Sequence, residues 1–235
     1  MTPSAPALVG CDESALVSFN QARLHRDVIR PLEQMTEAAR RAGFSLQVAS
    51  GYRSFERQRA IWEAKASGQR PVLDEWGQPL DVERLSELEL THAILRWSAL
   101  PGASRHHWGT DMDVYDASAL AKGDTLELTR AECEAGGSMY RFHQWLTGFL
   151  ASEANPGFYR PYDMDRGGVA PEPWHLSFAP IANGYARAFT VDLLRRHLRE
   201  HSLALQATVV THLPVLFERY VRVPLGPKGE TSNET

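Results

Sequence analysis

The sequence predicts an α+β fold, with a small central antiparallel sheet flanked by helices and a helical C-terminal extension. Short segments at residues 44–50, 111–116 and 172–178 have the alternation or the apolar content of strands, and longer stretches with helical periodicity separate them. The chain has 235 residues, of which 43% are hydrophobic. These values suit one domain with a sizeable core, or one domain with an appendage.

Amphipathic spacing and helix-terminating residues predict where the helices lie. Residues 12–42 have a helical pattern, in which Pro31 suits the first turn of a second helix and Gly43 suits a helix end. Further helices are predicted over residues 55–67, 83–98, 139–153, 183–203 and 207–220.

The pattern divides the chain into three parts. We expect a main domain over residues 12–180, a helical extension packed on it over residues 181–222, and a flexible polar tail over residues 223–235. Within the main domain, the prolines and glycine of residues 69–82 predict a long surface loop. Loops of this kind are often functional lids, although many are merely insertions.

Charge and hydropathy exclude several classes of function. The formal net charge is −4 and there are no basic runs, so no nucleic-acid partner is expected. No apolar run approaches the roughly 18 residues of a membrane helix, so no membrane span is expected. The first residues do not resemble a signal peptide, which predicts a cytoplasmic protein, or a periplasmic or exported one if a leader was removed. The sequence leaves the oligomeric state open.

The strand candidate richest in chemical groups follows Gly109, a residue that lets the chain turn back. After this turn, Asp111 and Asp113 alternate with Met112 and Val114. Alternation at period two places the two acids on one face of a strand and the two apolar side chains on the other. A buried strand with a carboxylate face makes sense if that face lies in a cleft that holds a cation.

Zinc in a hydrolase usually has three protein ligands and one open position. The chain offers His106 and Asp113 on either side of the turn, and His175 three residues after Glu172. Glu172 would then lie beside the metal and take a proton from a water that the metal has acidified. Arg53, on an exposed turn, could stabilise an oxyanion. Spacing alone does not establish these assignments, because His-x6-Asp and Glu-x2-His are each weak signals.

Three motifs in order are more specific, and together they resemble the zinc D-alanyl-D-alanine carboxypeptidases. This family shares its fold with the D-alanyl-D-alanine dipeptidases and with the Hedgehog signalling domain. The resemblance covers about residues 20–180, and the C-terminal helices look like those of the VanY-like carboxypeptidase branch. The three motifs are Ser50-Gly51-Tyr52-Arg53-Ser54, Ser104-x-His106-x2-Gly109-x3-Asp113 and Glu172-x-Trp174-His175.

The resemblance implies one zinc ion, held by His106, Asp113 and His175. It also implies that Glu172 is the catalytic base and that Arg53 stabilises the transition state. The residues expected to contact substrate are Ser104, Gln58, Tyr52 and Trp174.

The sequence leaves the roles of two further residues open, Asp111 and His107. Asp111 departs from the family, which usually has alanine there; it could tune substrate charge preference or face solvent, and we do not count it as a ligand. His107 is not expected to bind metal, and a role in the cleft wall or behind the ligands is about as plausible as a surface position.

The implied reaction is hydrolysis of the terminal peptide bond of a peptidoglycan stem peptide, with release of D-alanine. A D,D-carboxypeptidase acting on the pentapeptide is favoured. The alternatives are an L,D-carboxypeptidase acting on tetrapeptide muropeptides and a cell-wall endopeptidase of the endolysin type. A non-catalytic binding module is a further class, against which the presence of Glu172 and Arg53 argues.

Overall fold

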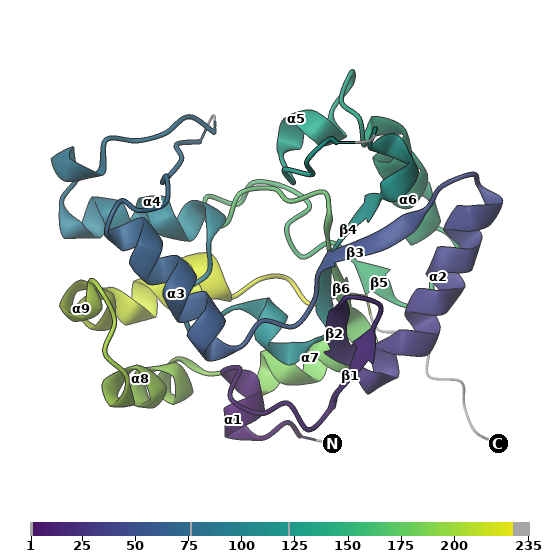
Figure 1. The fold of residues 1–235 in the computed structure, drawn as a ribbon. Helices are drawn as coiled ribbons and strands as arrows, with labels where there is room; N and C mark the ends of the chain where they lie inside the picture. Colours follow the sequence, from purple (N-terminus) through teal and green to yellow (C-terminus); the bar gives the residue numbers. More distant parts are fainter. Residues whose placement is uncertain (1, 76, 122, 228–235) are drawn as a thin grey trace.

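A computed structural model describes residues 2–75, 77–121 and 123–227 (Figure 1). Within these residues, one antiparallel sheet has the strand order β3-β4-β6-β5. The fold is therefore α+β with a small antiparallel sheet, which confirms the predicted class. The strands of this sheet are β3 (Leu46–Ser50), β4 (Asp111–Asp116), β5 (Phe158–Tyr159) and β6 (His175–Phe178).

The helices surround this sheet, and local capping defines where several of them begin. The Ser54 side chain accepts from the Arg57 amide at the start of α3, and Ser86 forms a reciprocal capping box with Glu89 at the start of α4. Among the described residues, no helix is long and apolar enough to cross a membrane. The helices are α1 (Ala5–Leu8), α2 (Ile29–Arg41), α3 (Phe55–Ala66), α4 (Glu87–Trp97), α5 (Arg130–Cys133), α6 (Tyr140–Leu150), α7 (Ala179–Ala188), α8 (Val191–Glu200) and α9 (Gln206–Leu216).

The predicted helix over residues 12–42 is wrong in its first half. This part of the chain forms a hairpin of β1 (Leu16–Phe19) and β2 (Ala22–His25), which pair from Leu16 with His25 to Phe19 with Ala22. Asn20 stands in the connecting turn with φ 52°, a conformation that asparagine tolerates better than most residues. A short β-hairpin therefore replaces the first half of the predicted helix, and α2 begins after this hairpin.

The sheet separates an apolar layer from a polar one. Met112 and Val114 of β4 and Leu176 of β6 pack with side chains of α2 and α6 in one buried cluster. Because side chains alternate along a strand, the other face of β4 and β6 carries the polar residues. The predicted division of β4 into an apolar and an acidic face is confirmed by this burial.

The C-terminal helices share a second apolar cluster with α3 and α4. Leu194 of α8 and Leu213 of α9 are fully buried in the same cluster as Trp62 and Ile94. The predicted helix over residues 207–220 corresponds to α9 and the helical turn that follows it, whereas the single helix predicted over residues 183–203 is wrong, because the chain there is divided between α7 and α8. α7 ends at Ala188, and Thr190 caps the start of α8, since its side chain accepts from the Leu193 amide.

The predicted flexible tail begins at residue 223, but its first part is fixed by hydrogen bonds. Asn183 of α7 accepts from the Gly226 amide at 3.0 Å and donates to the Gly226 carbonyl at 3.1 Å. Residues 228–235 lie outside the described residues. Through Gly226, the segment 223–227 is attached to α7.

We expect Gly109→Ala to lower the free energy of unfolding by about 2–4 kcal/mol. Gly109 has φ 66°, and a Cβ atom there would lie 2.5 Å from Leu16 Cδ2 and 2.9 Å from the His25 amide nitrogen. Gly43→Ala is the matched control, because its φ is 87° but a Cβ atom would meet nothing within 4 Å in the described structure. Urea unfolding measures both, and equal losses would contradict the proposed crowding at Gly109.

Candidate active site

The register of β4 and β6 assembles the polar face of the sheet. Asp113 pairs with His175, and Asp111 pairs with Ser177. All four side chains lie on the face opposite the apolar layer, because positions two apart on a strand share a face. Two adjacent strands thus bring a histidine and two carboxylates together.

The turn before β4 supplies the second histidine. His106 lies in a short 3-10 helix, Arg105–Trp108, which ends at Gly109 in the left-handed conformation. Its Nδ1–H donates to the Gly51 carbonyl at 2.8 Å, and its own carbonyl accepts from the Arg53 amide at 3.1 Å. These bonds join the Gly51–Arg53 turn to the histidine and leave His106 Nε2 as the nitrogen free to bind a metal.

His106, Asp113 and His175 fit a metal ion. Their ligand atoms lie within 4.8 Å of one another, and all three residues are buried. Asp113 Oδ2 is 3.4 Å from His106 Nε2, and Asp113 Oδ1 is 3.4 Å from His175 Nδ1. Asp113 Oδ1 is buried without a hydrogen-bond partner among the described residues, an arrangement that a bound cation would satisfy. Two imidazoles and one carboxylate are a donor set typical of zinc.

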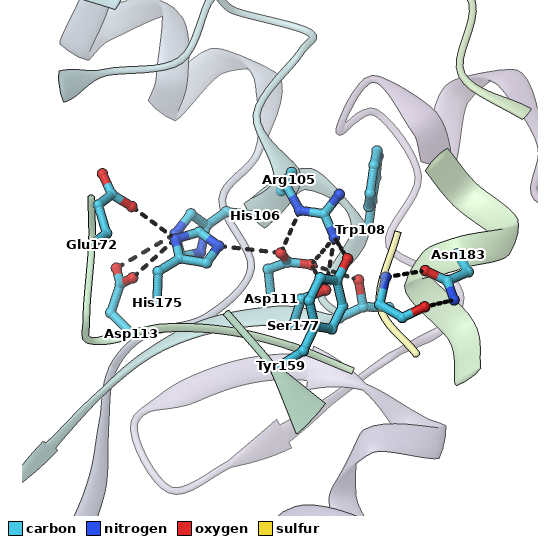
Figure 2. A network of polar contacts seen from close by, with 12 residues as sticks. Arg105, His106, Trp108, Asp111, Asp113, Tyr159, Glu172, His175, Ser177 and Asn183 are labelled. Carbon is cyan, nitrogen blue, oxygen red and sulfur yellow. Dashed lines mark hydrogen bonds and ion pairs between the residues drawn. The ribbon is translucent and has the colours of Figure 1, made fainter. Parts of the chain in front are cut away.

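Glu172 lies beside these three residues. Its Oε2 is 3.1 Å from His175 Nδ1, and its backbone is fixed by hydrogen bonds to Tyr162 and His175. Figure 2 shows Glu172 and Asp113 on one side of the His175 ring and Asp111 on the other. Burial would lower the pKa of His175, but hydrogen bonds from its ring to Asp111 and Glu172 outweigh burial and raise it to about 10. The pocket therefore favours positive charge, as a cation site should.

Arg53 stands at the edge of this cluster with a fixed guanidinium. Its Nη1 donates to Gln58 Oε1 at 2.8 Å, and its Nη2 donates to Ser50 Oγ at 3.3 Å. Burial lowers the pKa of Arg53, while the charges of Asp113 and Glu172 act in the opposite direction. The guanidinium of an arginine stays protonated in proteins, so Arg53 is charged despite its burial. Arg53 therefore holds a positive charge within the field of Asp113 and Glu172.

A cavity of about 780 Å³ opens over the site, within the size range of ligand pockets. Four parts of the chain line it: the α3–α4 region, the turn and strand over residues 104–113, the segment around α5, and the segment leading into β6. Part of the predicted loop over residues 69–82 forms one wall, through Leu73, Glu75, Gly77 and Gln78. The site residues that line the cavity are Arg53, Ser104, His106, Asp113, Glu172, Trp174 and His175.

The pattern of the VanY family, D-alanyl-D-alanine carboxypeptidases, matches residues 21–181, which is well over half of the chain. The chain belongs to this family. The predicted family resemblance is thereby confirmed.

The chain is also similar to individual proteins and to a solved structure. The chain is 29% identical over 124 residues to an uncharacterized protein of Haemophilus influenzae, covering 52% of this chain and 92% of that one. It is 28% identical over 153 residues to a D-alanyl-D-alanine carboxypeptidase of Enterococcus faecalis, covering 64% of this chain but only 46% of that enzyme. The structure of VanYB in complex with D-alanine-D-alanine shares the fold, with a TM-score of 0.50, 21% identity, and coverage of 83% of this chain and 88% of that one.

The substrate-contact candidates of this VanY-family chain separate into two groups. Ser104 and Trp174 line the cavity, and the Ser104 side chain makes no capping bond to its own helix in the described structure. Gln58 is fully buried behind Arg53 and donates to the Ala99 carbonyl, and Tyr52 donates to the Gly10 carbonyl. Neither of these two lines the cavity within the described chain, and Gln58 orients Arg53 through the hydrogen bond from Nη1, so a contact of Gln58 or Tyr52 with substrate stays a prediction.

His107 is buried between the two turns that carry His106 and Arg53. Its Nδ1–H donates to the Arg53 carbonyl at 2.6 Å, and its Nε2 accepts from the Gly102 amide at 3.1 Å. Burial lowers the pKa of His107 to about 3, which keeps the ring neutral and able to make both bonds. Of the two roles left open by the sequence, the surface position is excluded, and His107 supports the Arg53 turn.

Asp111 does not face solvent. It is completely buried, and its Oδ2 accepts from Arg105 Nε at 2.7 Å and from His175 Nε2 at 3.1 Å. Burial would raise the pKa of Asp111, but the Arg105 charge and the hydrogen bond from His175 outweigh burial and lower it to about 2. The period-two alternation of β4 already placed Asp111 beside Asp113, but the sequence pattern did not reveal its contact with His175.

Tyr162 is a further neighbour that sequence reasoning missed. Its ring meets the His175 ring edge to face at a centroid distance of 5.0 Å, and it lines the cavity. Tyr162 lies in an irregular segment rich in proline and glycine, where no periodicity indicates which side chains point inward.

Proposed function

We propose that this VanY-family chain is a zinc-dependent carboxypeptidase that removes the terminal D-alanine from peptidoglycan stem peptides, acting as a D,D-enzyme on the pentapeptide. The observation that carries the proposal is the cluster of His106 Nε2, Asp113 and His175 Nδ1 at the base of the cavity, with the unpartnered Asp113 Oδ1 inside it. The name of the E. faecalis relative supports the same class of reaction.

His106, Asp113 and His175 would hold one zinc ion, with a fourth position open toward the cavity. Zinc bound there would polarise the scissile carbonyl and acidify the attacking water. Both histidines have their distal ring nitrogen engaged, by the Gly51 carbonyl and by Asp111, which fixes the nitrogen that faces the ion.

Glu172 would be the general base. It is held 3.1 Å from His175 Nδ1 without itself belonging to the three-ligand cluster. In this position its carboxylate can take a proton from the attacking water and later give it to the departing amine of D-alanine. The same carboxylate would thus serve both proton transfers.

Arg53 would stabilise the negative charge that develops on the carbonyl oxygen. Gln58 and Ser50 hold its guanidinium, so little reorganisation is needed when that charge forms. Ser104 and Trp174 line the cavity and are candidates for contact with the peptide. The cavity is large enough for a longer peptide than a dipeptide, which supports a stem peptide as substrate.

We expect the zinc-loaded protein to release D-alanine from a pentapeptide muropeptide, with mass spectrometry of the products as the measurement. The matched tetrapeptide muropeptide is the second substrate, and chelator-treated protein is the control. Release of D-alanine from the tetrapeptide alone would favour the L,D-alternative, and cleavage within intact sacculi would favour the endopeptidase. If neither peptide loses D-alanine and chelators change nothing, the enzymatic proposal is wrong.

A further inference from the structure

The cluster behind His175 is unusually rich in buried charge. Arg105 and Asp111 are 4% and 0% exposed, and their side chains form an ion pair with Nε–Oδ2 at 2.7 Å. Arg105 also lies over the Trp108 ring, 4.7 Å from its centroid. A buried charge without a partner is strongly destabilising, so each of these two residues requires the other.

Every acceptor direction of Asp111 is used. Oδ1 accepts from Thr110 Oγ1 at 3.0 Å and from Ser177 Oγ at 2.9 Å, while Oδ2 accepts from Arg105 and from His175 Nε2. Figure 2 shows this carboxylate between the Arg105 guanidinium and the His175 ring. The side chain is thus held in one orientation from several directions.

This arrangement decides how His175 can act. An ionised carboxylate only accepts hydrogen bonds, so the Nε2 atom that faces Asp111 must carry a proton. A neutral ring then has its lone pair on Nδ1, and Nδ1 is the atom that faces Asp113 and Glu172. In His106 the two ring nitrogens have the opposite roles. Its Nδ1–H donates to the neutral Gly51 carbonyl, and its Nε2 faces Asp113.

We propose that the Arg105–Asp111 pair is a positioning unit for His175, which fixes its ring and its Nε2–H tautomer and thereby strengthens metal binding. The inference rests on the proposed zinc site. Carboxylates behind ligating histidines increase the basicity of the ring. In the motif that the chain resembles, alanine usually stands at the position of Asp111, so the resemblance does not itself assign this role.

We expect Asp111→Ala to weaken zinc binding by about 10–100-fold, measured by competition with a chromophoric chelator. Asp116→Ala is the matched control, because Asp116 is also a buried carboxylate of β4 but accepts hydrogen bonds from Ser45 and Ser118, away from His175. For this control we expect the zinc affinity of the parent protein. The absorption spectrum of the cobalt-substituted protein is a second readout, and it should shift only in Asp111→Ala.

Asp111→Ala also leaves Arg105 buried without its partner, so a double variant, Arg105→Leu with Asp111→Ala, separates the two effects. If the pair positions His175, the double variant regains thermal stability but still binds zinc weakly. Parent-like zinc affinity in the double variant would overturn the inference while the proposed function stands. A parent protein that binds no zinc would overturn both.

Discussion

His106→Ala is expected to abolish zinc binding and peptide hydrolysis together. His106 contributes one of the three candidate ligand atoms, and its Nε2 lies 3.4 Å from Asp113 Oδ2. Changes to residues behind a ligand already weaken metal binding by about 10–100-fold, so loss of the ligand itself should weaken it further. Metal analysis after dialysis and release of D-alanine from the pentapeptide measure the two effects.

His212→Ala is the control for this variant. His212 belongs to α9 and is not among the residues that line the cavity. We expect this variant to keep both zinc and activity. A His106→Ala protein that retains a full equivalent of zinc would contradict the assignment of His106 as a ligand.

Glu172→Gln is expected to lower kcat by about 10²–10⁴-fold while zinc remains bound. Glutamine keeps the size of the side chain but cannot take a proton from water, and Glu172 lies outside the three-ligand cluster. The measurement is kcat for D-alanine release, together with the zinc content of the same preparation.

Glu134→Gln is the matched control, because Glu134 also lines the cavity but forms an ion pair with Arg130 on α5. Its kcat should remain within a few-fold of the parent value. If Glu172→Gln protein loses its zinc, the separation between base and ligands fails, and Glu172 must be counted among the groups that hold the metal.

Several features of the site could be predicted from short sequence patterns. Gly109 predicted a turn, and the alternation after it predicted one acidic and one apolar face. The structure shows both, with Met112 fully buried and Asp113 facing the cavity. Local spacing was sufficient here because the turn and the faces of one strand depend on neighbouring residues only.

Local patterns were misleading where competing structures fit the same residues. The segment before α2 has apolar residues that suit either a helix or a hairpin, and Asn20 in its turn was the signal for the hairpin. The C-terminal region forms an additional helix because Thr190 caps a new start within a continuous amphipathic pattern. In both segments, individual capping and turn residues determine which element forms and where it begins. Hydrophobic periodicity alone does not detect these residues.

Side-chain direction was a second limit. Gln58 lies five residues after Arg53, and the family resemblance implied a contact with substrate. In the folded chain it is fully buried between the Arg53 guanidinium and the Ala99 carbonyl. The path of a distant segment therefore determines whether such a residue faces the cavity or the protein interior.

The sequence by itself determined the family, the turn at Gly109, and the residues that form the candidate metal cluster, since these depend on local spacing and on motifs in order. The tertiary structure decided how Asp111 acts. Its partners Arg105, His175 and Ser177 come from a 3-10 helix and from a strand about sixty residues away in the sequence. Their contacts depend on the register between β4 and β6, which is a long-range property of the sheet and is not encoded in the spacing of any one segment.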